Sequence, residues 1–234
     1  MNDTVLTYSY KFELENGIEK TFVVNLKENS LEYLPPEELK FPKWALLSNF
    51  RCGNCPLSEA ESKYCPLAVN LAEIISFFSD VASFEKARIT VGSPERTYYK
   101  HTSVQSGISG LIGILMVTGG CPVMAKLKPM VRFHLPFATI EETEYRVFSF
   151  YLLSQLVRKE LGGEPDWELN GLHKMYREIE EVNKNVVEKI RSLSKKDAGI
   201  NSIIVLNNFA NFVTIKLDEK DIEYFENLFK DLLD

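Results

Sequence analysis

Cysteines are the residues of this chain whose type and spacing could do chemistry. Three of the four lie in the segment RCGNCPLSEAESKYCPLAVNL, at Cys52, Cys55 and Cys65, and the fourth is Cys121. The spacing is therefore C-x2-C-x9-C followed by one distant cysteine. Because thiolates bind soft metals, this pattern predicts a metal centre ligated by all four cysteines.

Prolines follow three of the four cysteines, at Pro56, Pro66 and Pro122. Proline suits the first turn of a helix, so each Cys-Pro pair predicts a cysteine at a helix N-cap. The partial positive charge at a helix start stabilises a thiolate and lowers its pKa. We therefore expect three helix starts to point toward one anionic site.

The identity of the metal is open between an iron–sulfur cluster and zinc. Ferredoxin-type sites also place a proline after a ligand cysteine and complete a local group with a distant ligand, which favours a [4Fe–4S] cluster with a redox or sensing role. Structural zinc sites more often contain two C-x2-4-C knuckles, and the second knuckle is missing here. Zn²⁺ in an interaction or regulatory module is the alternative. A third reading has no metal, with Cys52 and Cys55 as a dithiol switch and Cys121 as a buried apolar residue.

A second dense stretch, KPMVRFHLPFATIEETEYR, follows Cys121 and places Arg132 and His134 between two prolines. We expect this part to be a short extended segment. His134 could ligate a metal or transfer protons, and Arg132 could bind an anionic cofactor or substrate. A cysteine-dependent enzyme that uses Cys121 as nucleophile and His134 as base is therefore a further alternative.

A packing role for the same residues is the simpler interpretation. His134 could lie between Phe133 and Phe137, with one ring nitrogen satisfied by the backbone. The acidic group that follows is explained by a capping box, in which Thr139 caps a helix and Glu142 reaches back to it.

Composition narrows the classes of partner and compartment. The net charge is −6 and charged residues make up 26% of the chain, in runs of mixed sign, so no basic face for nucleic acid is expected. The longest apolar run, LIGILMVTGG, is far shorter than the roughly 20 residues of a membrane span and predicts a buried helix. The start of the chain resembles no export signal, so we expect a cytoplasmic protein with an unidentified protein or small-molecule partner.

The hydrophobic pattern predicts an α+β fold: a small antiparallel sheet packed with a larger helical part. Alternation indicates strands over 4–14 and 19–26, joined by a type I′ turn at Asn16 and Gly17, with a short third strand near 30–34. A second hairpin is expected over 86–101. Helices are expected over 66–82, 103–118, 122–131, 140–161, 171–194, 199–216 and 219–233.

These elements are expected to form one α+β domain over residues 1–234. Residues 1–50 are mainly β, 51–85 hold the cysteines and a helix, 86–101 form the hairpin and 102–234 are helical. The second hairpin comes after the cysteines and could join the first sheet, which would interweave the two halves.

Three stretches together resemble a family of proteins: CGNCPL with YCPLAVNL, the run from TGGCP to ETEYR, and PDWELNGL. The chain resembles an uncharacterised bacterial family, a domain of unknown function with a CxxCP...CP...GGCP cysteine pattern. The resemblance covers nearly the whole chain and implies that it is one unit. It implies no activity, cofactor or catalytic residue.

Overall fold

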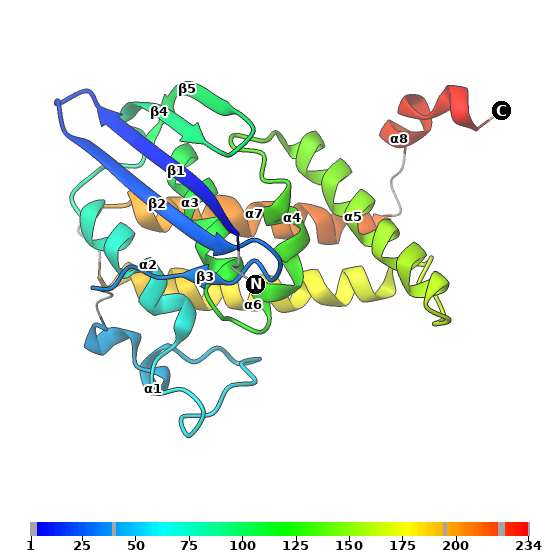
Figure 1. The fold of residues 1–234 in the computed structure, drawn as a ribbon, viewed down its shortest axis with the longest axis horizontal. Helices are drawn as coiled ribbons and strands as arrows, with labels where there is room; N and C mark the ends of the chain where they lie inside the picture. Colours follow the sequence, from blue (N-terminus) through cyan, green and yellow to red (C-terminus); the bar gives the residue numbers. More distant parts are fainter. Residues whose placement is uncertain (1–3, 39–40, 194–195, 220–222, 234) are drawn as a thin grey trace.

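The computed structural model describes residues 4–38, 41–193, 196–219 and 223–233, and these form an α+β fold (Figure 1). A five-stranded antiparallel sheet is built from the strands β1 (Val5–Leu14), β2 (Glu19–Lys27), β3 (Tyr33–Leu34), β4 (Lys86–Gly92) and β5 (Thr97–Ser103). The helices are α1 (Leu47–Phe50), α2 (Pro66–Phe77), α3 (Val104–Thr118), α4 (Lys128–Arg132), α5 (Ile140–Glu160), α6 (Asn170–Arg191), α7 (Ala198–Glu219) and α8 (Glu223–Leu228).

The sheet has one buried and one exposed face because apolar and polar residues alternate along its strands. In β1 every second residue is buried, from Leu6 through Tyr10 and Phe12 to Leu14. The strand order is β3-β2-β1-β4-β5, so β1 pairs with β2 on one side and with β4 on the other. The second hairpin therefore joins the first sheet, across the cysteine segment that separates them in sequence.

The first hairpin turns differently from the type I′ prediction. Among the described residues of this turn only Gly17 has a positive φ, of 86°, whereas a type I′ turn needs two such residues. The Leu14 N–H donates to the Ile18 carbonyl at 2.9 Å, and the Gly17 N–H donates to the Leu14 carbonyl at 3.0 Å. The loop is thus longer than two residues, with Gly17 in the left-handed position.

The helices pack against the buried face of the sheet and against one another. Helix α3 contacts α2, α7 and the strands, and α6 packs along α7. Figure 1 shows α6 and α7 side by side. Helices α5 and α8 lie on the side of the molecule where the C-terminus is, at the right of the view. The predictions over 122–131 and 219–233 were too long. In place of a helix over 122–131, the chain forms a 3-10 turn (Met124–Leu127) and the short α4. In place of a helix over 219–233, it forms α8 and a final 3-10 turn (Lys230–Leu232). Residues 220–222 of that prediction lie outside the described part.

Glycines on α3 let this helix lie against the sheet. A Cβ at Gly107 would collide with side chains of Ile89 and Phe12, and one at Gly110 would lie 2.9 Å from the Tyr10 hydroxyl. Larger residues would push the helix away from the strands, so these glycines serve close packing.

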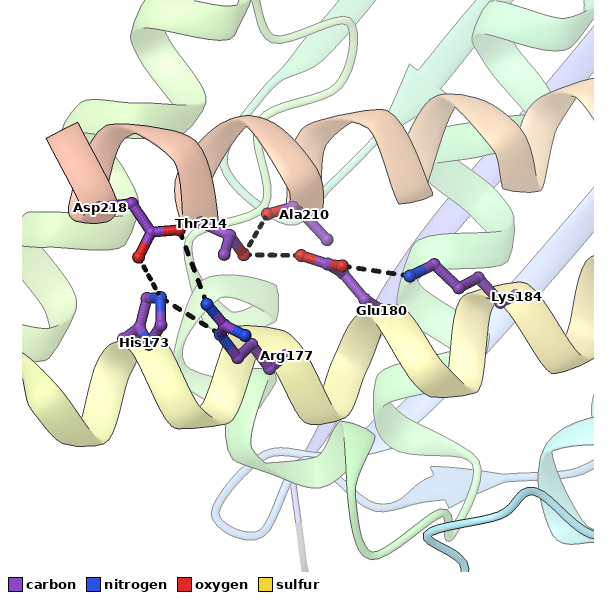
Figure 2. A network of polar contacts seen from close by, with 7 residues as sticks. All are labelled: His173, Arg177, Glu180, Lys184, Ala210, Thr214 and Asp218. Carbon is purple, nitrogen blue, oxygen red and sulfur yellow. Dashed lines mark hydrogen bonds and ion pairs between the residues drawn. The ribbon is translucent and has the colours of Figure 1, made fainter.

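Polar contacts join α6 and α7 along one side (Figure 2). His173 Nε2 lies 2.9 Å from Asp218 Oδ1. Arg177 Nη2 lies 3.6 Å from the other carboxylate oxygen, Asp218 Oδ2. His173 Nε2 cannot both donate to Asp218 and accept from Arg177, and the shorter distance to the carboxylate favours donation. Nearby along the same side, the Thr214 hydroxyl of α7 donates to Glu180 Oε1 of α6 at 2.6 Å. Glu180 is the most buried carboxylate of this network.

Helix α7 is, within the described ranges, the one helix long and apolar enough to cross a membrane by length and composition. It packs against α3 and α6 and has buried residues along its length. These contacts are typical of a core helix in a folded domain.

Candidate metal centre

All four cysteines line one small cavity, which we call the cysteine cavity. Its walls include Phe50, Leu67, Val123, Val182 and Val186 in addition to Cys52, Cys55, Cys65 and Cys121. Cys65 is buried, the other three are half-buried, and none of the four is in a disulfide. The structure therefore brings Cys121 to the three cysteines that are close together in sequence.

Hydrogen bonds to α6 position the loop that carries Cys52 and Cys55. The Cys55 N–H donates to the Cys52 carbonyl at 3.1 Å, which closes the turn between them. Asn54 Nδ2 donates to the Glu178 carbonyl at 2.9 Å. Asn185 Nδ2 lies 3.3 Å from Cys52 Sγ and donates to it. Both asparagines thus fix the C-x2-C turn against the same helix.

Cys65 is the N-cap of α2, with Pro66 at the first helical position as predicted. Its N–H donates to the Ala45 carbonyl at 2.8 Å, and this bond fixes the chain directly before α2. No side-chain capping hydrogen bond forms, but the backbone N–H groups of Leu67 and Ala68 lower the pKa of its thiol in part. The helix start therefore points toward the sulfur.

Cys121 reaches the cavity through the two glycines that end α3. Gly120 has a φ of 99°, in the left-handed region that favours glycine, and a Cβ there would lie 3.3 Å from Pro66. At Gly119 any Cβ would collide with Asn70, whose Nδ2 donates to the Gly119 carbonyl at 2.8 Å. These glycines allow the chain after α3 to turn sharply against the start of α2.

The prediction of three helix starts was correct only at Pro66. Residues after Pro56 form a loop, and Pro122 opens a turn that leads into the 3-10 turn at Met124. The N–H groups of that turn still act on the thiol, since those of Val123 and Met124 lower the pKa of Cys121 in part. One helix and one helical turn therefore face the cavity.

The pKa values of Cys52, Cys65 and Cys121 are raised, which corrects the expectation of activated thiolates. Burial, together with repulsion from the other cysteines, raises the pKa of Cys52 to about 12. Burial also raises the pKa of Cys65 to about 11 and that of Cys121 above its usual value, although backbone N–H donors lower both in part. In the absence of a metal, these three thiols are protonated at neutral pH.

The cysteine cavity is narrow, with a volume of about 20 Å³, which is room for about one water molecule. As the side chains are placed, no group of three or more His, Cys, Asp or Glu residues within the described ranges could hold a metal ion. Metal binding by all four cysteines would therefore require their sulfurs to rearrange around the metal.

His134 and Arg132 do not line the cysteine cavity. Arg132 is the last residue of α4, not part of an extended segment, and its guanidinium lies 3.2 Å from Glu28. His134 follows in the turn after α4 and lines a second, larger cavity, which we call the apolar cavity. The structure thus separates these two side chains from the predicted ligands.

The His134 ring is held by tyrosines of β1. Its Nε2 pairs with the Tyr10 hydroxyl, and the Tyr8 ring packs edge-on at 5.6 Å between centroids. Phe133 is 77% exposed, so the predicted packing of His134 between Phe133 and Phe137 was wrong: the ring contacts Tyr8 and Tyr10 instead. The predicted capping box of Thr139 and Glu142 is confirmed.

Sequence reasoning missed four residues that shape the site: Asn70, Asn185, Gly119 and Gly120. The pair Gly119-Gly120 directly before Cys121 was a usable signal, because consecutive glycines often mark a position with positive φ. Asn185 is distant in sequence from Cys52, which it contacts, and Asn70 is distant from Gly119, to whose carbonyl it donates. No local pattern marks either asparagine.

Comparison with known proteins gives a family and no activity. No curated protein and no solved structure matches the chain. One family matches almost its full length, over residues 6–230, which include all four cysteines. The chain therefore belongs to the family described as a domain of unknown function, DUF6901.

Proposed function

We propose that this protein binds a [4Fe–4S] cluster through Cys52, Cys55, Cys65 and Cys121 and acts as a cytoplasmic redox or sensing protein. The observation that supports it is the convergence of all four cysteines on one cavity, from three separate segments of the chain. A ligand shared by all four half-buried or buried thiols would explain why they meet at one place.

Hydrogen-bond donors around the sulfurs support an anionic centre. A four-thiolate cluster carries negative charge, and N–H donors to the sulfurs stabilise it and tune its reduction potential. Asn185 donates to Cys52. Backbone N–H groups at the start of α2 and in the turn after Pro122 favour the thiolates of Cys65 and Cys121, whose pKa values they lower in part. The apolar walls limit access of water, and the half-buried cysteines lie close enough to the surface for electron exchange with a partner.

The chemistry supplied by the bound cluster would be one-electron transfer. The chain would contribute the four thiolates, the N–H donors and an apolar wall, and ligation would release the thiol protons to solvent. For a sensor, the same ligation would fix the loop of Cys52 and Cys55 against α2 and α6.

Zn²⁺ is the second candidate, and the narrow cysteine cavity favours it. A single ion needs less space than a cluster and draws four sulfurs to about 2.3 Å from one point. The metal would then connect three segments and contribute folding energy without redox chemistry.

A cysteine-dependent enzyme is less well supported by the geometry. Cys121 lines the cysteine cavity and His134 lines the apolar cavity, where it pairs with Tyr10. The raised pKa of Cys121 also opposes a thiolate nucleophile in the metal-free protein.

Anaerobic purification with metal analysis tests the proposal. We expect a brown protein with about four iron and four sulfide per chain, as a [4Fe–4S] centre requires. The substitution Cys121→Ser should lower the iron content as strongly as Cys55→Ser, because both residues are ligands. Ser149→Ala, at an exposed position of α5, is the matched control and should keep the full content.

A colourless protein with one zinc per chain would reject the cluster and support the second candidate. Metal-free protein that binds neither iron–sulfur clusters on reconstitution nor zinc would reject both. The proposal also expects the cysteine pattern CxxCP...CP...GGCP to mark the family, which would have a bacterial origin. A family alignment in which these cysteines vary independently would contradict it.

A further inference from the structure

The apolar cavity shares α6 with the cysteine cavity and is lined by residues of α3, α5, α6, α7 and the segment around α4. Its volume is about 390 Å³, within the range of small-molecule sites. Most of the wall is aliphatic or aromatic, from residues such as Ile114, Val117, Ile179, Leu206 and Phe209. A ligand with an apolar body of about ten carbon atoms would find matching surface there.

The charged side chains of this wall are all cationic. Arg146 and Lys100 line the cavity, and no Asp or Glu is among the described residues that do so. Lys100 is exposed at the edge, with its ammonium 5.8 Å from the centre of the Phe137 ring. The charge pattern therefore favours an anionic group on the ligand.

Arg146 is held in place by backbone carbonyls. Its Nη2 donates to the Met130 carbonyl at 2.8 Å and to the Phe133 carbonyl at 2.9 Å. Burial lowers the pKa of this half-buried guanidinium, and among the carboxylates of the described residues Glu142 acts on it by charge. Both N–H groups of Nη2 are thus used for positioning, and the three on Nε and Nη1 remain to donate singly to a carboxylate.

Asn183 adds a buried polar atom to the same wall. The residue is 1% exposed, and its Oδ1 has no hydrogen-bond partner. A buried carbonyl oxygen without a partner is costly, and a donor on a ligand would satisfy it. Asn183 is independent of Arg146, because it lies on α6 and Arg146 lies on α5.

We propose that the apolar cavity binds an amphipathic organic acid, whose carboxylate pairs with Arg146 and whose body carries a hydroxyl or amide donor for Asn183. The binding is non-covalent and uses none of the four cysteines. His134, fixed by Tyr10, closes the wall beside α4.

Calorimetric titration of the full-length protein with decanoate, decanol and decylamine tests the charge preference. We expect decanoate to bind at least about tenfold more tightly than decanol, since hydrogen bonds to charged groups are the stronger ones. Decylamine should bind most weakly. Equal affinities for the three probes, or tighter binding of decylamine, would overturn the proposal.

Variants locate the site. Arg146→Gln should bring the affinity for decanoate down to that for decanol, and Arg158→Gln, at an exposed position of the same helix, should change neither. A Cβ at Gly113 meets only Leu206, at an ordinary 3.6 Å, so Gly113→Leu can fill the cavity and should abolish binding of both probes. Retained binding in Gly113→Leu would contradict the proposal even if Arg146→Gln fails to fold.

Hydroxylated probes test the role of Asn183. We expect either 3-hydroxydecanoate or 10-hydroxydecanoate to bind about five- to tenfold more tightly than decanoate, because of the added hydrogen bond. Asn183→Leu should remove this gain without weakening decanoate. If the gain is absent in the natural protein or persists in Asn183→Leu, Asn183 is not a ligand contact and that part of the proposal is wrong.

Discussion

Cys65 shows how burial and helix geometry compete at a single residue. Two backbone N–H groups at the start of α2 lower its pKa, yet burial outweighs them and the pKa is about 11. A helix start alone therefore does not make a thiolate in this cavity. Positive charge from the metal proposed above would supply the missing contribution, because metal coordination deprotonates a thiol outright.

His134 predicts a pH dependence of stability. Burial, with a smaller contribution from the positive charge of Arg146, lowers its pKa to about 3 in the folded protein, against about 6.5 in an unfolded chain. Between these pH values the unfolded state binds a proton that the folded state does not, so stability falls as the pH is lowered from about 6.5. The slope is at most about 1.4 kcal/mol per pH unit, and smaller to the extent that water reaches this half-buried ring.

The substitution His134→Gln should remove that part of the pH dependence, because glutamine keeps a polar group near Tyr10 and does not titrate. Urea unfolding at several pH values between 4 and 7 gives the measurement. His101→Gln, at an exposed strand position, is the control and should leave the slope unchanged. Parallel curves for the natural protein and His134→Gln would show that the ring protonates freely in the fold.

At the scale of elements, the turn between α3 and Cys121 couples backbone conformation to the site. Gly120→Ala places a Cβ at positive φ and close to Pro66, so we expect a loss of about 1–2 kcal/mol in stability together with lower metal content. Gly162→Ala is the matched control, since Gly162 also has a positive φ but open space around it and is not part of the site. It should lose similar stability and keep its metal. Equal metal contents in both variants would contradict the role of Gly120.

The contact of α6 with α7 gives a second prediction at this scale. Thr214→Val removes the hydroxyl that donates to the largely buried Glu180, which should cost about 1–3 kcal/mol in the free energy of unfolding. Thr214→Ser keeps the hydroxyl and should cost less. Chemical denaturation compares both variants. A loss in Thr214→Ser as large as that in Thr214→Val would contradict the prediction, because Thr214→Ser keeps the hydroxyl.

The strands and long helices were predictable because their apolar periodicity is local. Failure at Pro56 has the same basis: the residues after it, Leu57 to Tyr64, are mostly polar and offer no apolar face for a helix, whereas an apolar pattern follows Pro66. The apolar cavity could not be predicted, since Arg146 and Asn183 come from different helices and are brought together only by tertiary packing.

At the scale of the whole molecule, the core does not depend on the cysteines for its continuity. One cluster of buried residues runs from β1 through α2 and α3 to α6 and α7. A metal at the cysteine cavity would therefore join segments at the edge of a core that is large enough to fold by itself.

Metal removal should accordingly destabilise the protein without unfolding it. We expect chelation to lower the melting temperature by about 5–10 °C, as a loss of a few kcal/mol does in a chain of this size, with the far-ultraviolet circular dichroism unchanged at 25 °C. Calorimetry and circular dichroism on loaded and chelated samples provide the measurement. Complete unfolding on chelation would show that the metal contributes the folding energy, as in zinc fingers.

Consecutive residues of α6 face the two cavities, Val182 the cysteine cavity and Asn183 the apolar cavity. A rigid helix cannot move one of them without moving the other. Any displacement of α6 on occupation of one cavity would therefore enter the binding free energy of the other. Thermodynamic reciprocity would then make the two affinities change by the same factor, in whichever order the sites are filled.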